Sequence, residues 1–125
     1  MRKPFFLLLA LGTLLAPGAL GQKATEQFIP IGQSPGLSGK RTYMGRIGTV
    51  DADGRAIGGK TWSATVTERT RIWLDRSKLG QRNTAGTTAD LKVGAVVEVK
   101  YAGAERGKSS GPAEWIKVEV AGPAR

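Results

Sequence analysis

Four side chains have the types and spacing needed to hold an anionic or sugar-like ligand. Arg71 and Trp73 stand two residues apart in one segment, and Trp115 and Lys117 stand two residues apart in another. Side chains two positions apart on a β-strand lie on the same face. Indole rings stack on bases or sugar rings, and neighbouring cations hold phosphates or other anions. The pattern is typical of a ligand-binding surface, and these four residues are the candidate site.

The residues that catalysis usually needs are scarce. The chain contains no histidine and no cysteine, so it lacks the usual general base, thiolate nucleophile and soft or borderline metal ligands. Ser77 beside Lys78, and the 108–110 segment, are adjacent serine–lysine sets in polar loops with nothing to bury the lysine and lower its pKa. Asp51 and Asp53 flank a turn without the further acidic ligands of a calcium loop. We therefore expect a protein that is not an enzyme, with no cofactor and no metal site.

The amino terminus has the three parts of a secretory signal peptide. A positively charged start precedes an apolar run from Phe5 to Ala16, and Ala19 and Gly21 supply small residues for cleavage. The apolar run is shorter than the roughly 20 residues that a helix needs to cross a bilayer. We predict that residues 1–21 are removed on export to the periplasm or the medium, rather than kept as a membrane anchor.

The chain is strongly basic. It has 19 Lys and Arg residues against 10 Asp and Glu residues, a net charge of +9 that falls to +7 if Arg2 and Lys3 leave with the signal peptide. Such an excess favours anionic partners such as nucleic acid, phospholipid head groups or acidic polysaccharide, and it equally serves solubility. Because there is no cysteine, burial alone must stabilise the fold.

The remaining chain divides into an arm, one domain and a tail. Residues 22–39 contain several prolines and glycines together with Phe28, Ile29 and Ile31, which predicts an extended arm that packs on the domain or on a partner. Residues 40–121 suffice for one core, and residues 122–125 form a short tail.

Short strands separated by turns fill the domain. In the first of them Gly45, Gly48 and a change in the parity of the apolar residues predict a bulge or bend that lets one strand serve two sheets. Trp62 is expected in the core, on one face with Ala64 and Val66. The strands predict an all-β fold, a small five-stranded OB-like Greek-key barrel. Their expected ranges are 43–50, 61–67, 70–75, 95–101 and 114–120.

Three stretches carry a resemblance to a known family. Met44–Asp51, Val66–Ile72, and Asp90–Gly94 followed by Val96–Val99 are similar to an uncharacterised family of small exported bacterial OB-like β-barrel domains. The resemblance covers roughly residues 40–120. It implies a fold and no assigned activity.

Two arrangements of the candidate site remain open. The third and fifth strands of an OB-like barrel are neighbours, so Trp73 and Trp115 are expected side by side on its outer surface, between Arg71 and Lys117. If they are open, the protein is a binding module for an anionic polymer, either glycan or nucleic acid, or for a protein. If the arm covers them, there is no such site. The alternative function is a structural or interaction protein of the cell envelope that docks through its arm.

Overall fold

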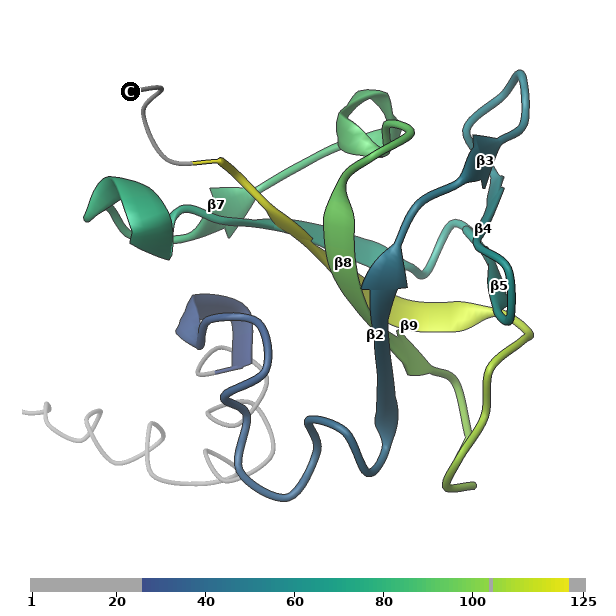
Figure 1. Cartoon of the computed structure of the whole chain (residues 1–125), viewed down its shortest axis with the longest axis horizontal. Coiled ribbons are helices and arrows are strands. Elements are labelled where there is room, and N and C mark those ends of the chain that lie inside the picture. Colours follow the sequence, from purple (N-terminus) through teal and green to yellow (C-terminus); the bar gives the residue numbers. More distant parts are fainter. Residues whose placement is uncertain (1–25, 104, 122–125) are drawn as a thin grey trace, which may run out of the picture.

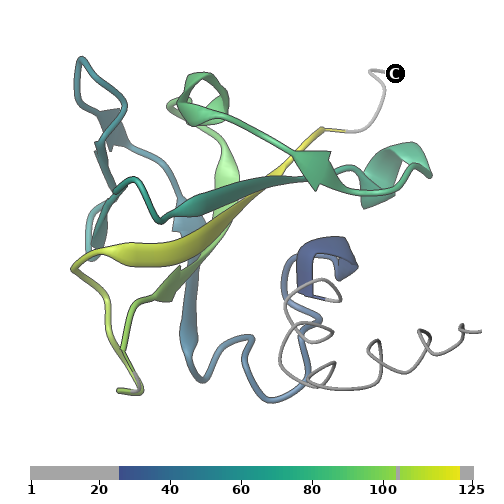
Figure 2. The same cartoon turned by 180° about the vertical axis from the view of Figure 1, so that it is seen from behind.

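The structure, a computed structural model, describes residues 26–103 and 105–121. These residues form two β-sheets and two short 3-10 turns, which confirms the all-β prediction (Figures 1 and 2). The predicted signal peptide, the first residues of the arm and the tail 122–125 lie outside the described residues. Within residues 26–103 and 105–121, no helix has the length and apolar character that a bilayer crossing requires.

The larger sheet has five strands in the order β2-β8-β9-β6-β7, and the smaller has three in the order β3-β4-β5. β6 and β9 run parallel, and the other neighbours are antiparallel. The strands are β2 (Thr42–Arg46), β3 (Thr49–Val50), β4 (Ala56–Gly58), β5 (Ser63–Thr65), β6 (Arg71–Asp75), β7 (Thr84–Ala85), β8 (Val96–Tyr101) and β9 (Ala113–Glu119). The 3-10 turns are η1 (Ser77–Leu79) and η2 (Thr88–Asp90).

The bend predicted in the first strand is confirmed. The backbone N–H of Ile47 donates to Ala95 O at 2.9 Å beside the larger sheet, and the N–H of Gly48 donates to Gly58 O at 2.7 Å in the smaller one. The chain therefore passes from the larger sheet to the smaller one between Ile47 and Gly48. The single predicted strand is observed as two strands, β2 and β3.

The prediction of a five-stranded barrel is wrong in strand number and in closure. Eight strands form two sheets and not one closed barrel. β4 escaped prediction because Ile57 is its single large apolar residue, too little for an alternating signal. The turn made by residues 67–70 separates β5, in the smaller sheet, from β6, in the larger one. Backbone hydrogen bonds from Ser63 and Thr65 to Ser109 and Gly111 connect β5 to the loop that precedes β9.

The core lies between the two sheets, as the strand parity predicts. Val97 and Val99 of β8 and Ile116 of β9 have no exposed surface. Trp62 is buried, and its ring stacks on Tyr43 with the centroids 5.9 Å apart, so its predicted core position is confirmed. The alternate side chains of the five-stranded sheet point away from this core, onto what we call the outer face.

The described part of the arm packs against that outer face (Figure 1). Residues 26–28 are helical. The side-chain amide of Asn83 donates to Gln27 O at 3.1 Å, and the guanidinium of Arg82 lies 4.6 Å from the centroid of the Phe28 ring. The apolar arm therefore has a place on its own domain.

Candidate binding groove

The four candidate residues come together on the outer face. In the parallel pairing of β6 with β9, Arg71 is the partner of Trp115 and Trp73 is the partner of Lys117. The rings of Trp73 and Trp115 lie 5.4 Å apart, inclined by 32°. The alternation along each strand and the pairing of the two strands together produce this cluster.

The two tryptophans are covered. Trp73 is 5% exposed and Trp115 is 1% exposed, while Lys117 has no exposed surface. Of the four candidates, Arg71 is the one that reaches solvent. The cluster therefore has no open ring face on which a base or a sugar could stack.

Lys117 is turned toward the arm. Its ammonium lies 4.7 Å from the Trp115 ring centroid and 5.9 Å from that of Trp73. It donates hydrogen bonds to Ile29 O at 2.9 Å and to Ser34 Oγ at 3.3 Å. Burial lowers the pKa of Lys117, and the nearby carboxylates oppose that shift. Lys117 thus holds the arm, and its charge is not available to a ligand in solution.

Two buried carboxylates complete the attachment of the arm. Glu98 accepts hydrogen bonds from Gly32 N at 3.0 Å and from Thr42 Oγ1 at 2.6 Å. Gly32 has a φ of +82°, a backbone conformation that favours glycine, and this conformation accompanies the donation of its N–H to Glu98. Sequence reasoning missed Glu98, because its parity on β8 predicts exposure and the cover comes from a distant segment.

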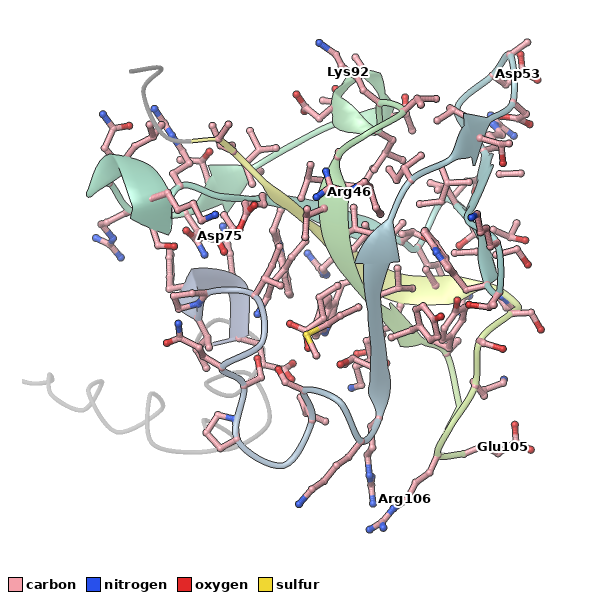
Figure 3. All side chains as sticks on the ribbon, viewed as in Figure 1. Arg46, Asp53, Asp75, Lys92, Glu105 and Arg106 are labelled. Atoms are coloured by element: carbon pink, nitrogen blue, oxygen red, sulfur yellow. The ribbon has the colours of Figure 1, made fainter. Side chains whose placement is uncertain are left out.

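Asp75 is the second carboxylate, and Figure 3 shows it between β6 and the arm. It accepts hydrogen bonds from Ile31 N at 2.8 Å, from Ser77 N at 3.0 Å and from Ser77 Oγ at 2.6 Å. Burial by itself would raise the pKa of Asp75, but these hydrogen bonds and the charge of Lys117 hold that pKa below its usual value. The acidic group is therefore kept ionised against the arm.

An open groove lies at the other end of the same face, where β6 and β9 begin. It has a volume of about 890 Å³. One wall is the turn before β6, and the opposite wall is the start of β9. We call it the Arg71 groove, and it is lined by Thr67, Glu68, Arg69, Thr70, Arg71, Trp73, Ala102, Pro112, Ala113, Glu114 and Trp115.

Hydrogen bonds within the turn and across to β9 set the shape of the groove. The hydroxyl of Thr70 accepts from Thr67 N at 2.8 Å and donates to Ala113 O at 2.7 Å. Arg69 N donates to Thr67 Oγ1 at 3.1 Å. The expected strand ranges 61–67 and 70–75 leave residues 68 and 69 for this turn, and its place beside β9 follows from the parallel pairing of β6 with β9.

The groove has free positive charge and one unused donor. Arg69 and Arg71 are exposed and form no ion pair within the described residues, whereas Glu114 is paired with Lys100 at 3.1 Å. The Nε1 of Trp115 is buried and has no hydrogen-bond partner in the described part of the chain. Leaving a buried donor unpaired costs about 1–3 kcal/mol. Because this nitrogen is buried, a ligand in the groove does not reach it.

The other residues considered for chemistry have local partners. The hydroxyl of Ser77 donates to Asp75, and Lys78 pairs with Glu119 at 3.2 Å. Lys108 donates to Ala102 O at 3.2 Å. Asp51 Oδ1 accepts from the backbone N–H groups of residues 55 and 56 at 2.7 and 3.2 Å, which confirms the turn interpretation.

Comparison with known proteins leaves the groove as the main guide to function. No protein family, curated protein or solved structure matches this chain. The function is therefore inferred from the groove's own shape, charge and hydrogen-bonding groups.

Proposed function

We propose that this protein is an exported, non-enzymatic binding module with an OB-like architecture, and that it holds an anionic polymer in the Arg71 groove. The observation that carries the proposal is a groove of about 890 Å³ with two exposed arginines and no ion pair on either of them within the described residues. Guanidinium groups that lack a protein partner can pair with an anion from solution.

The strand arrangement supports the OB-like part of the proposal. The first strand continues from the five-stranded sheet into the three-stranded sheet, and the strands that we take as third and fifth, β6 and β9, lie parallel. Modules of that architecture bind polymers across an exposed face. The net charge, +7 once residues 1–21 are removed, has the sign that attracts an anionic polymer over a distance.

In the groove, the four candidate residues have different roles from those expected if both tryptophans were exposed. Arg71 would contact the ligand, Trp73 and Trp115 would form part of the floor, and Lys117 would hold the arm from behind. The ligand would thus be recognised by charge and hydrogen bonds more than by stacking.

The alternative function, docking through the arm, has less support. The described part of the arm already donates backbone hydrogen bonds to Asp75 and Glu98 of its own domain and accepts one from Lys117. A partner would have to replace these contacts before it could bind the arm. We therefore prefer the groove.

Charge removal on the groove tests the proposal. We expect the double variant Arg69→Gln with Arg71→Gln to bind a panel of anionic polymers at least tenfold more weakly, and its affinity to depend less on salt. The panel contains oligogalacturonate and a single-stranded oligonucleotide, with affinities from isothermal titration calorimetry at two salt concentrations.

The matched control removes two charges elsewhere. Arg106 and Lys92 are exposed, lie outside the groove and are labelled in Figure 3. The double variant Arg106→Gln with Lys92→Gln has the same net charge as the groove variant. Equal losses in the two double variants, or no binding of any polymer to the natural protein, would overturn the proposal.

A further inference from the structure

The groove and the arm meet on one continuous surface. Lys117 is the strand partner of Glu98 on one side and of Trp73 on the other. Next to this row, Trp115 is the strand partner of Arg71. Strand partners on one face of a sheet have neighbouring side chains. Both tryptophans line the groove, and the ammonium of Lys117 lies against both rings. The surface that holds the arm is therefore the direct continuation of the groove.

The surface that faces the arm has the composition of a binding surface and not that of a core. The arm contacts the ammonium of Lys117 and the carboxylates of Glu98 and Asp75. The opposite face of β8 has the aliphatic side chains Val97 and Val99. Charged side chains are rarely buried unless they are paired, whereas aromatic rings beside cations are typical of surfaces that hold polymers. Water or a ligand could therefore take the place of the arm on this surface.

The arm itself is attached mainly by polar contacts. Residues 26–39 belong to no strand, and among them Ser34 alone is buried. The aromatic side chain of Phe28 is 42% exposed. None of these residues belongs to the apolar core between the sheets. Exchanging a hydrogen bond within the protein for one to water changes the free energy little on balance. Release of the arm would therefore leave the apolar core closed.

We propose that the arm is a releasable strap that inhibits polymer binding. In the closed form the ligand is limited to the Arg71 groove, and in the open form the binding surface extends over Trp73, Trp115 and Lys117. This inference rests on the proposed function, because it concerns the regulation of the same groove. Only open molecules offer the additional surface, so the closed form lowers the apparent affinity for the polymer.

Replacing the arm tests the proposal on the mature chain. Residues 26–39 are exchanged for a glycine–serine sequence of equal length, which removes the contacts of the arm and keeps every residue of the sheets. Iodide quenching of tryptophan fluorescence should rise, because Trp73 and Trp115 become accessible while Trp62 stays in the core. The polymers tested are oligogalacturonate and a single-stranded oligonucleotide. Each one that binds the natural protein should bind this variant at least tenfold more tightly in calorimetry.

A single substitution loosens the arm without removing it. Gly32 has a φ of +82° and donates its N–H to Glu98, whereas proline fixes φ near about −65° and has no N–H. Gly32→Pro should raise both quenching and affinity, by less than the full replacement does. Gly107→Pro is the matched control, because Gly107 also has a positive φ and is exposed, outside the arm and the groove lining. Equal effects of the two proline variants would contradict the proposal.

The outcomes separate this inference from the proposed function. If β8 and β9 lose their protection from amide hydrogen exchange in the replacement variant, the arm is part of the fold and the inference is overturned. If quenching stays the same, or rises without tighter binding, the inference is also overturned and the groove stands as the binding site. Adding Arg69→Gln with Arg71→Gln to the replacement variant should weaken binding again, because the two surfaces are continuous, and undiminished binding would refute the inference. If neither polymer binds any of these proteins, both proposals fall.

Discussion

The outer face of the five-stranded sheet has two ends with similar residues and opposite surroundings. At the covered end, Lys117, Glu98 and Asp75 point at the arm, and each has hydrogen bonds to it. At the open end, Arg69 and Arg71 point into a groove and have no ion pair within the described residues. The charged side chains at the two ends therefore have different roles. Those at the covered end bind the arm, and those at the open end are free to bind a ligand.

The arm accounts for the difference. Its backbone N–H and C=O groups have no sheet of their own, so they pair with side chains of the face that they cover. Lys117, Glu98 and Asp75 are thus committed because the arm lies over them, whereas Arg71 is not. The comparison predicts large stability effects at the covered end and small ones at the open end.

The largest effect is expected from Lys117→Met. Removing the ammonium leaves Glu98 and the carbonyl of Ile29 buried without the charge that faces them, and breaking such a buried arrangement costs about 3–5 kcal/mol. Urea unfolding of the two proteins measures the change. Lys92→Met, at an exposed position, should change the free energy of unfolding by no more than about 0.5 kcal/mol. A loss below about 1 kcal/mol for Lys117→Met would show that the covered end is not the more important one for stability.

Asp75→Asn is expected to have an intermediate, pH-dependent effect. The folded pKa of Asp75 lies below its unfolded value, so its ionisation stabilises the fold above the unfolded pKa of 3.8, and this stabilisation is lost as the pH falls through the folded pKa. The variant should lose about 1–3 kcal/mol at pH 7 and much less near pH 2. Urea unfolding across that pH range provides the measurement, with Asp53→Asn on an exposed turn as control. A pH-independent difference would contradict the assigned role of the carboxylate.

The smallest effect on stability is expected at the open end. Arg71→Gln should change the free energy of unfolding by no more than about 0.5 kcal/mol, because the guanidinium is exposed and forms no ion pair within the described residues. The same variant should weaken ligand binding. Thermal unfolding of this variant beside Arg106→Gln measures the effect. A loss above about 1 kcal/mol would place Arg71 among the residues that maintain the fold.

Strand parity predicted the two faces of the sheet well. Ile72 and Ile116 are in the core, and Trp73 and Trp115 point away from it, side by side. The bend in the first strand was also visible, because two glycines and a change of parity mark it. The face of each side chain and the bend depend on residues close together in the chain, where the alternation of side chains is strict, whereas the neighbouring of Trp73 and Trp115 was expected from the OB-like strand order.

Exposure on the outer face was not predictable in the same way. Glu98 and Lys117 alternate with core residues and have the pattern of solvent-facing charges, yet both have no exposed surface. Their cover comes from residues 26–39, far along the chain, and its position depends on contacts between segments distant in the sequence. The groove is likewise formed by two segments whose parallel pairing has no local signal.

By itself, the sequence determined the all-β class, the core side of each long strand and the scarcity of catalytic groups, because alternation and composition are local properties. The tertiary structure alone decided that the strands form two sheets, that Lys117 belongs to the arm and that Arg71 belongs to a groove. The physical reason is that a side chain's parity selects a face of the sheet, whereas burial depends on what packs over that face.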